Sequence, residues 1–65
     1  MMRVVYRDTN AWEEVLVTTS NDIAGLLAIF KESGKVTIKQ KEYVVNEYRF
    51  RYDENDMPEL YIELL

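Results

Sequence analysis

The order of apolar and polar residues predicts one helix and five strands in this 65-residue chain. Residues 2–7 are β-branched and aromatic with charges between them, which is typical of a strand. Residues 12–18 have a similar pattern, and Asp8 to Ala11 between the two segments have the composition of a turn. The two segments therefore predict a hairpin, although the pattern leaves its register and the orientation of Trp12 open.

A change in the spacing of apolar residues predicts the position of the helix. Ile23, Leu26, Leu27 and Phe30 recur at intervals of three and four residues, which places them on one face of a helix over residues 21–33.

Both ends of this helix carry capping signals. Ser20 or Thr19 is expected as the N-cap, and Asp22 favours the positive end of the helix dipole. Lys31 suits the negative end, and Gly34 is placed to adopt the left-handed conformation that ends many helices.

After Gly34 the period changes to two, which predicts a strand over residues 35–40. A short polar connection at residues 40–42 leads to a long strand. The adjacent apolar residues Val44 and Val45 interrupt its alternation, which predicts a bulge or a three-residue loop nearby.

The last two strands predict a specific pairing. In the long strand, aromatic residues alternate with charged ones, and residues 60–65 follow after a polar loop that contains Pro58. Antiparallel pairing that matches apolar with apolar residues sets Tyr52 opposite Leu60, Phe50 opposite Ile62 and Tyr48 opposite Leu64. On the other side it sets Arg51 opposite Tyr61 and Arg49 opposite Glu63.

Together these elements predict a single α+β domain over residues 1–65. It is a small two-layer fold in the order ββαβββ, with one amphipathic helix packed on one face of an antiparallel sheet. One helix cannot cover both faces of five strands, so the second face is expected to be open to solvent or to a partner.

Composition narrows the classes of function. The chain has no cysteine and no histidine, so thiolate chemistry, the usual near-neutral base and the commonest metal ligand are all missing. A domain of this size also has little core from which to form a deep pocket. We therefore expect no enzyme activity, no cofactor and no metal site. The lack of cysteine, of a signal peptide and of an apolar span favours a soluble protein of the cytoplasm.

Charge suggests one alternative function. The net charge is −4, yet residues 35–52 carry five basic and two acidic side chains. Lys39, Lys41, Arg49 and Arg51, with Tyr43 and Tyr61 among them, are expected on the open face, where they would suit a nucleic-acid-binding protein. Two features argue against affinity for phosphate groups: these cations can pair with Glu47 and Glu63, and the net charge of the chain is negative.

The acidic residues suggest two further readings. Asp53, Asn55 and Asp56 are possible oxygen ligands, but they lack the pattern of a calcium loop. A second hypothesis makes the acidic surface a mimic of nucleic acid.

The leading hypothesis is a small protein-binding module that modulates or inhibits a larger partner protein. The last strand, Leu60 to Leu65, is apolar on both sides, so it is expected either to be covered on both or to pair as an edge with another chain, such as a second copy. The predicted partner-binding residues are Tyr43, Arg49, Arg51, Tyr61 and Glu63. A structural subunit of an assembly is a further alternative. In length and composition the chain is similar in type to small accessory proteins of bacteriophages and other mobile elements.

Overall fold

The computed structural model describes residues 1–52 and 57–65, and it contains one helix and five strands, as predicted. They are β1 (Met2–Asp8), β2 (Glu13–Ser20), α1 (Ile23–Ser33), β3 (Lys35–Ile38), β4 (Lys41–Arg51) and β5 (Glu59–Leu64). The acidic segment at residues 53–56, and with it the calcium-loop question, lies outside the described residues.

The sheet has the strand order β2-β1-β5-β4-β3. The prediction of an antiparallel sheet is only partly correct, because β1 and β5 pair in parallel while the other neighbours are antiparallel. β5 is therefore a central strand and not the edge that the sequence left open. This position explains its apolar residues, since strands in the middle of a sheet are covered most completely.

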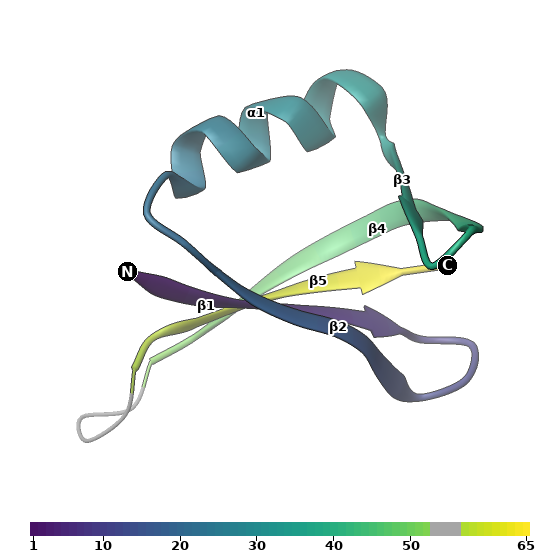
Figure 1. The fold of residues 1–65 in the computed structure, drawn as a ribbon, viewed down its shortest axis with the longest axis horizontal. Helices are drawn as coiled ribbons and strands as arrows, with labels where there is room; N and C mark the ends of the chain where they lie inside the picture. Colours follow the sequence, from purple (N-terminus) through teal and green to yellow (C-terminus); the bar gives the residue numbers. More distant parts are fainter. Residues whose placement is uncertain (53–56) are drawn as a thin grey trace.

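The two ends of the chain form the centre of the sheet. Val4 and Val5 of β1 are buried beside Ile62 and Leu64 of β5. Because the two strands run in the same direction, the N-terminus and the C-terminus lie at opposite ends of the sheet (Figure 1).

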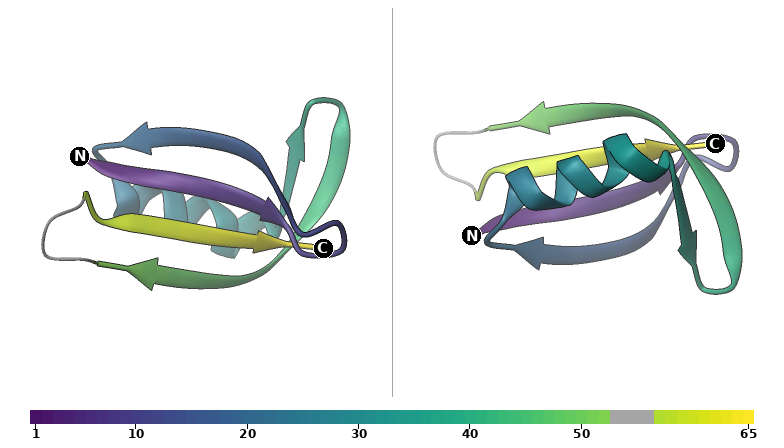
Figure 2. Two further views of the ribbon diagram at one scale, coloured as in Figure 1. Left: turned by 90° about the horizontal axis from the view of Figure 1, so that it is seen from below. Right: turned by 90° about the horizontal axis from the view of Figure 1, so that it is seen from above.

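The helix lies across these two central strands. Figure 2 shows α1 over β1 and β5, with β2 on one flank and β4 on the other. Its core face consists of Phe30, which is buried, and of Ile23, Leu26 and Leu27, which pack against the core, as the period predicted. Phe30 meets the ring of Tyr6 edge to face at 6.1 Å, and burial raises the pKa of the Tyr6 phenol.

The ends of α1 confirm one predicted cap and correct another. Gly34 has a φ of 67° and its N–H donates to the carbonyl of Phe30 at 2.7 Å, as expected for a left-handed C-terminal residue. The N-cap is Asp22, not Ser20 or Thr19. Its Oδ1 accepts from the N–H of Gly25 at 3.0 Å, whereas Ser20 lies within β2 and accepts from the N–H of Asp22. Gly25 has a local reason to be small, since an added Cβ would collide with the carboxylate of Asp22.

The pairing of β4 with β5 keeps the predicted faces but shifts the register by two residues. Phe50 lies opposite Leu60, Tyr48 opposite Ile62, and Arg49 opposite Tyr61. The predicted irregularity near Val44 and Val45 is present as a shift in the ladder between Val45 and Glu47. Residues 41–44 of β4 pair with β3, and Val45 and residues 47–51 pair with β5.

Lys39 and Gln40 form the turn between β3 and β4, with φ values of 52° and 68°. Two successive residues with positive φ are characteristic of the tight hairpin turn whose twist matches the flanking strands. β3 therefore ends at Ile38, two residues earlier than predicted.

Trp12 and Phe50, large aromatic residues of the kind that usually anchor a core, are instead exposed. Phe50 and Trp12 are 58% and 78% exposed, respectively. Phe50 lies on β4, beyond the area that α1 covers, and Trp12 belongs to the β1–β2 turn with a φ of 55°.

Candidate functional site

The sheet surface opposite α1, called the open face below, holds every arginine of the chain. Alternation along the strands directs Arg3 and Arg7 of β1 and Arg49 and Arg51 of β4 to this side. The same alternation and pairing add four glutamates: Glu14, Glu47, Glu59 and Glu63. The open face is thus rich in charge but balanced.

Glu63 is the centre of this network. Arg7 donates to its two carboxylate oxygens, from Nη2 at 2.5 Å and from Nε at 3.1 Å, and Arg49 approaches at 4.0 Å. Glu63 is only 2% exposed, so the pairing compensates for the loss of its hydration. These hydrogen bonds also raise the pKa of the Arg7 guanidinium. Arg7 lies over the Tyr61 ring at 5.2 Å, which fixes its plane further.

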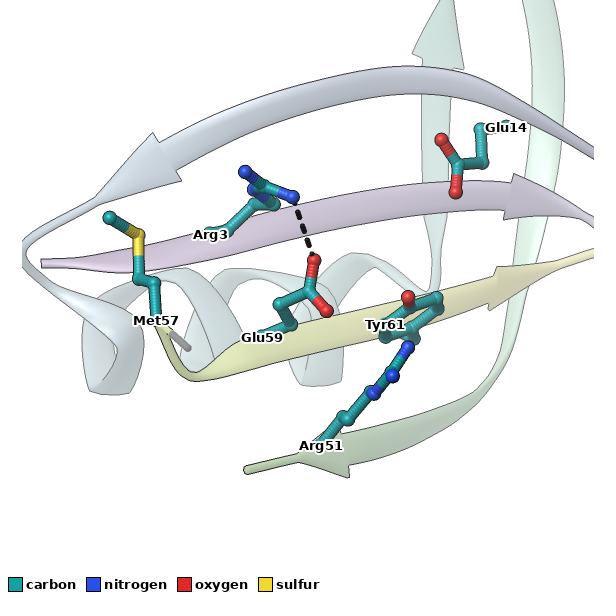
Figure 3. Close-up of a pocket in the computed structure, with 6 residues that line it drawn as sticks. All are labelled: Arg3, Glu14, Arg51, Met57, Glu59 and Tyr61. Carbon is teal, nitrogen blue, oxygen red and sulfur yellow. Dashed lines mark hydrogen bonds and ion pairs between the residues drawn. The ribbon is translucent and has the colours of Figure 1, made fainter. Parts of the chain in front are cut away.

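A shallow hollow of about 390 Å³ lies beside this network. It is lined by Arg3, Glu14, Arg51, Met57, Glu59 and Tyr61. Arg3 Nη1 donates to Glu59 Oε2 at 3.1 Å, and Figure 3 shows Arg51 extending from β4 toward the Tyr61 ring. The hollow is therefore polar and wide open, and at least part of its charge is already paired within the chain.

Four of the five predicted partner-binding residues share the open face: Arg49, Arg51, Tyr61 and Glu63. Tyr43 does not, because it is 5% exposed and belongs to the core cluster. Its ring is covered by the ammonium group of Lys41 at 5.1 Å.

The cations of the nucleic-acid alternative do not form one surface. Lys39 lies in the β3–β4 turn, and Lys41 is 3.6 Å from Asp8 at the same end of the sheet. Arg49 and Arg51 lie beyond the irregularity of β4, on the stretch that pairs with β5. With Tyr43 buried between the two groups, the expected platform of cations and rings is absent from the described residues.

Arg3 and Arg7 were not among the residues that the sequence pattern indicated for the site. Their role depends on the parallel pairing of β1 with β5, which sets Arg3 beside Glu59 and Arg7 beside Glu63. One signal was present: two arginines four residues apart near the start of the chain match two glutamates four residues apart near its end. Equal spacing is what a parallel pair requires.

A second candidate surface lies on the other side of β4. Tyr48 and Phe50 of β4 lie on the side of the sheet that carries α1, and Tyr52, the residue after β4, stacks on Phe50; these three residues are called the aromatic ridge below. All three are exposed, and the rings of Phe50 and Tyr52 stack at 6.2 Å with an interplanar angle of 24°. Their strand neighbours Leu60 and Ile62 are buried in the core. The ridge is therefore an apolar surface continuous with the core.

Comparison with protein-family models, with curated proteins and with solved structures finds no match for this chain. Within residues 1–52 and 57–65, no helix is long and apolar enough to cross a membrane. The same residues hold no group of three or more side chains arranged to bind a metal ion.

Proposed function

We propose that this protein is a non-catalytic binding module that docks another protein on the aromatic ridge. The observation that carries the proposal is the exposure of Tyr48, Phe50 and Tyr52 on the side of the sheet that α1 covers only in part. Docking at this place would complete the apolar layer that α1 begins.

The physical basis is the apolar area that the ridge leaves in water. Phe50 and Tyr52 are 58% and 66% exposed, and burial of apolar surface contributes about 25 cal/mol per Å². Aromatic residues dominate the centres of protein interfaces, and tyrosine hydroxyls can remain hydrated at the rim. The partner we expect is an apolar element, such as one face of an amphipathic helix, lying on β4 beside α1.

The open face supports docking less well. Glu63 is saturated by Arg7, and Arg3 pairs with Glu59, so a partner would have to displace contacts within the chain. Its charges are balanced, which removes the long-range attraction that a surface of one sign provides.

The test uses neighbouring residues of β4 that point to opposite sides of the sheet. Tagged wild-type protein and the variants Phe50→Lys and Arg49→Glu are used to capture proteins from nuclease-treated cell lysate, with the fold checked by circular dichroism. We expect wild type and Arg49→Glu to retain one stoichiometric protein and Phe50→Lys to lose it.

Loss with Arg49→Glu and retention with Phe50→Lys would move the interface to the open face. If the wild type retains no protein, or only material that nuclease removes, the binding-module proposal is wrong.

A further inference from the structure

The outer edge of β2 has no neighbour within residues 1–52 and 57–65. β2 is eight residues long and none of its residues is buried. Its ladder with β1 is irregular near Val15, and Leu16 to Ser20 beyond that point pair regularly with β1. These five residues present unpaired backbone groups along one side.

This edge lacks the features that usually prevent strand addition. Leu16 to Ser20 contain no charged residue and no proline, and two of them, Leu16 and Val17, are exposed apolar residues. The opposite edge differs, because β3 has only four residues and begins with Lys35, and the stretch of β4 beyond it carries Glu47, Arg49 and Arg51. The contrast singles out β2 as the edge that is open to pairing.

We infer that β2 pairs with β2 of a second copy of this chain, antiparallel and about a two-fold axis at Val17. This register places Val17 against Val17 on the open face and Leu16 against Thr18 on the side of α1. Two five-stranded sheets then join into one continuous sheet, in which each copy uses the same residues.

The distribution of charge in β2 fits pairing with a second copy of the chain. Both acids, Glu13 and Glu14, lie at the start of the strand, and the hydroxyl residues Thr18, Thr19 and Ser20 lie at its end. Antiparallel pairing about Val17 sets Glu13 and Glu14 level with Asn21 and Ser20 of the second copy, so neither acid lies opposite another charge. A parallel arrangement would set each acid against its own copy, and an axis at Thr18 would set Glu14 against Asp22.

Trp12 gives a second, independent indication at the same edge. It precedes β2, is 78% exposed and has a φ of 55°, which is unfavourable for a bulky side chain. In the proposed register Trp12 lies beside residues 20–22 of the second copy, where its ring can be covered. The dimer thus accounts for an exposed tryptophan that the isolated chain leaves in water.

The first experiment measures the molar mass of the full chain by sedimentation velocity or by light scattering after gel filtration. We expect the wild type to be a dimer at micromolar to millimolar concentration. Val17→Lys should raise the dissociation constant by about tenfold or more, because the axis sets two lysines against each other. Thr18→Lys provides a second variant on the same strand in case the first is poorly folded.

Val44→Lys is the matched control, since Val17 and Val44 are the same residue type with the same exposed fraction, 48%. It should dimerise like the wild type. A wild-type protein that is monomeric up to millimolar concentration, or a dimer that Val17→Lys and Val44→Lys weaken equally, would overturn the inference.

Cross-linking tests the register. Because the chain has no cysteine, Val17→Cys introduces a single thiol that meets its own copy at the axis, within the range that a disulfide can span. We expect mild oxidation to link Val17→Cys rapidly and Val44→Cys slowly. Equal rates would contradict the register. The aromatic ridge lies on β4, so capture of a partner protein by Val17→Lys reports separately on the proposed function.

Discussion

At the scale of single residues, Glu63 shows how an acid can be held in a sheet that one helix covers. Its carboxylate is 2% exposed although it points away from α1, because Arg7 and Arg49 lie over it from the two neighbouring strands. The two arginines are unequal. Arg7 donates two hydrogen bonds and its side chain is 24% exposed, whereas Arg49 reaches only 4.0 Å and its side chain is 63% exposed.

This inequality predicts different losses of stability. Arg7→Met should lower the free energy of unfolding by about 2–3 kcal/mol, because it leaves Glu63 buried without its hydrogen-bond donors. Arg49→Met should cost less than about 1 kcal/mol, as is usual for an exposed ion pair. Urea denaturation of both variants measures the difference. Equal losses would mean that Arg7 has no special role in holding the carboxylate.

Single residues also show what the sequence can and cannot predict about burial. Phe30 was predicted in the core from its helical period, and it is buried there. Phe50 has an equally regular strand period but is exposed, because burial on β4 depends on how far α1 extends across the sheet. The period specifies the side of an element on which a residue lies, and a neighbouring element decides whether that side is covered.

At the scale of elements, the β3–β4 turn contains backbone strain that glycine would relieve. Lys39 and Gln40 both have positive φ, a conformation in which a Cβ approaches the backbone unfavourably and which glycine adopts freely.

Gln40→Gly should therefore raise the free energy of unfolding by about 0.5–1 kcal/mol, and Lys39→Asn in the same chain should raise it further. Thr37→Gly, within β3, is the control and should lower stability, because a strand interior gains nothing from glycine. Thermal denaturation compares the three variants. A loss of stability in Gln40→Gly would show that the Gln40 side chain contributes more than its backbone strain costs.

The pairing of β4 with β5 shows why a register is hard to predict from a pattern of period two. The predicted and observed registers differ by two residues, and such a shift leaves every side chain on its own side of the sheet. Apolar residues meet apolar ones in both cases. The side of the sheet on which each residue lies could thus be predicted, and this holds for Arg49, Arg51, Tyr61 and Glu63. The residue that lies opposite each of them could not, because it depends on the length of the connecting loop.

At the scale of the whole molecule, the small core explains the exposed aromatic surface. A single helix of 11 residues lies over a five-stranded sheet, and it covers the two central strands. The flanking strands β2 and β4 keep apolar side chains in water, and these are the two surfaces on which we propose binding. On these proposals, a partner element packed on β4 and a second copy paired at β2 would cover apolar surface that a chain of 65 residues cannot cover alone.

The parallel pairing of β1 with β5 is the part of the fold that sequence patterns missed. Neighbouring segments of a chain usually pair with each other, and the β1–β2 and β4–β5 pairs could be predicted on that basis. The central pair joins residues 56 positions apart, as in the bond between Arg7 and Glu63. No local period reports such a contact, and only the equal spacing of two arginines and two glutamates indicated it.

The same pairing decides how the protein responds to a mechanical load. A pull on the two termini draws β1 and β5 in opposite directions along their common axis, because their free ends lie at opposite ends of the sheet. The hydrogen bonds between them are then loaded in shear and must break together.

A pull between residue 1 and residue 21 instead opens the β1–β2 ladder from its end, bond by bond, since Met2 lies opposite Ser20. Single-molecule stretching through cysteines introduced at these positions should give a higher unfolding force along the first axis than along the second. Equal forces would mean that the β1–β5 pair does not bear the load. We therefore expect a force applied through β1 and β5 to meet more resistance than a force applied across the β1–β2 hairpin.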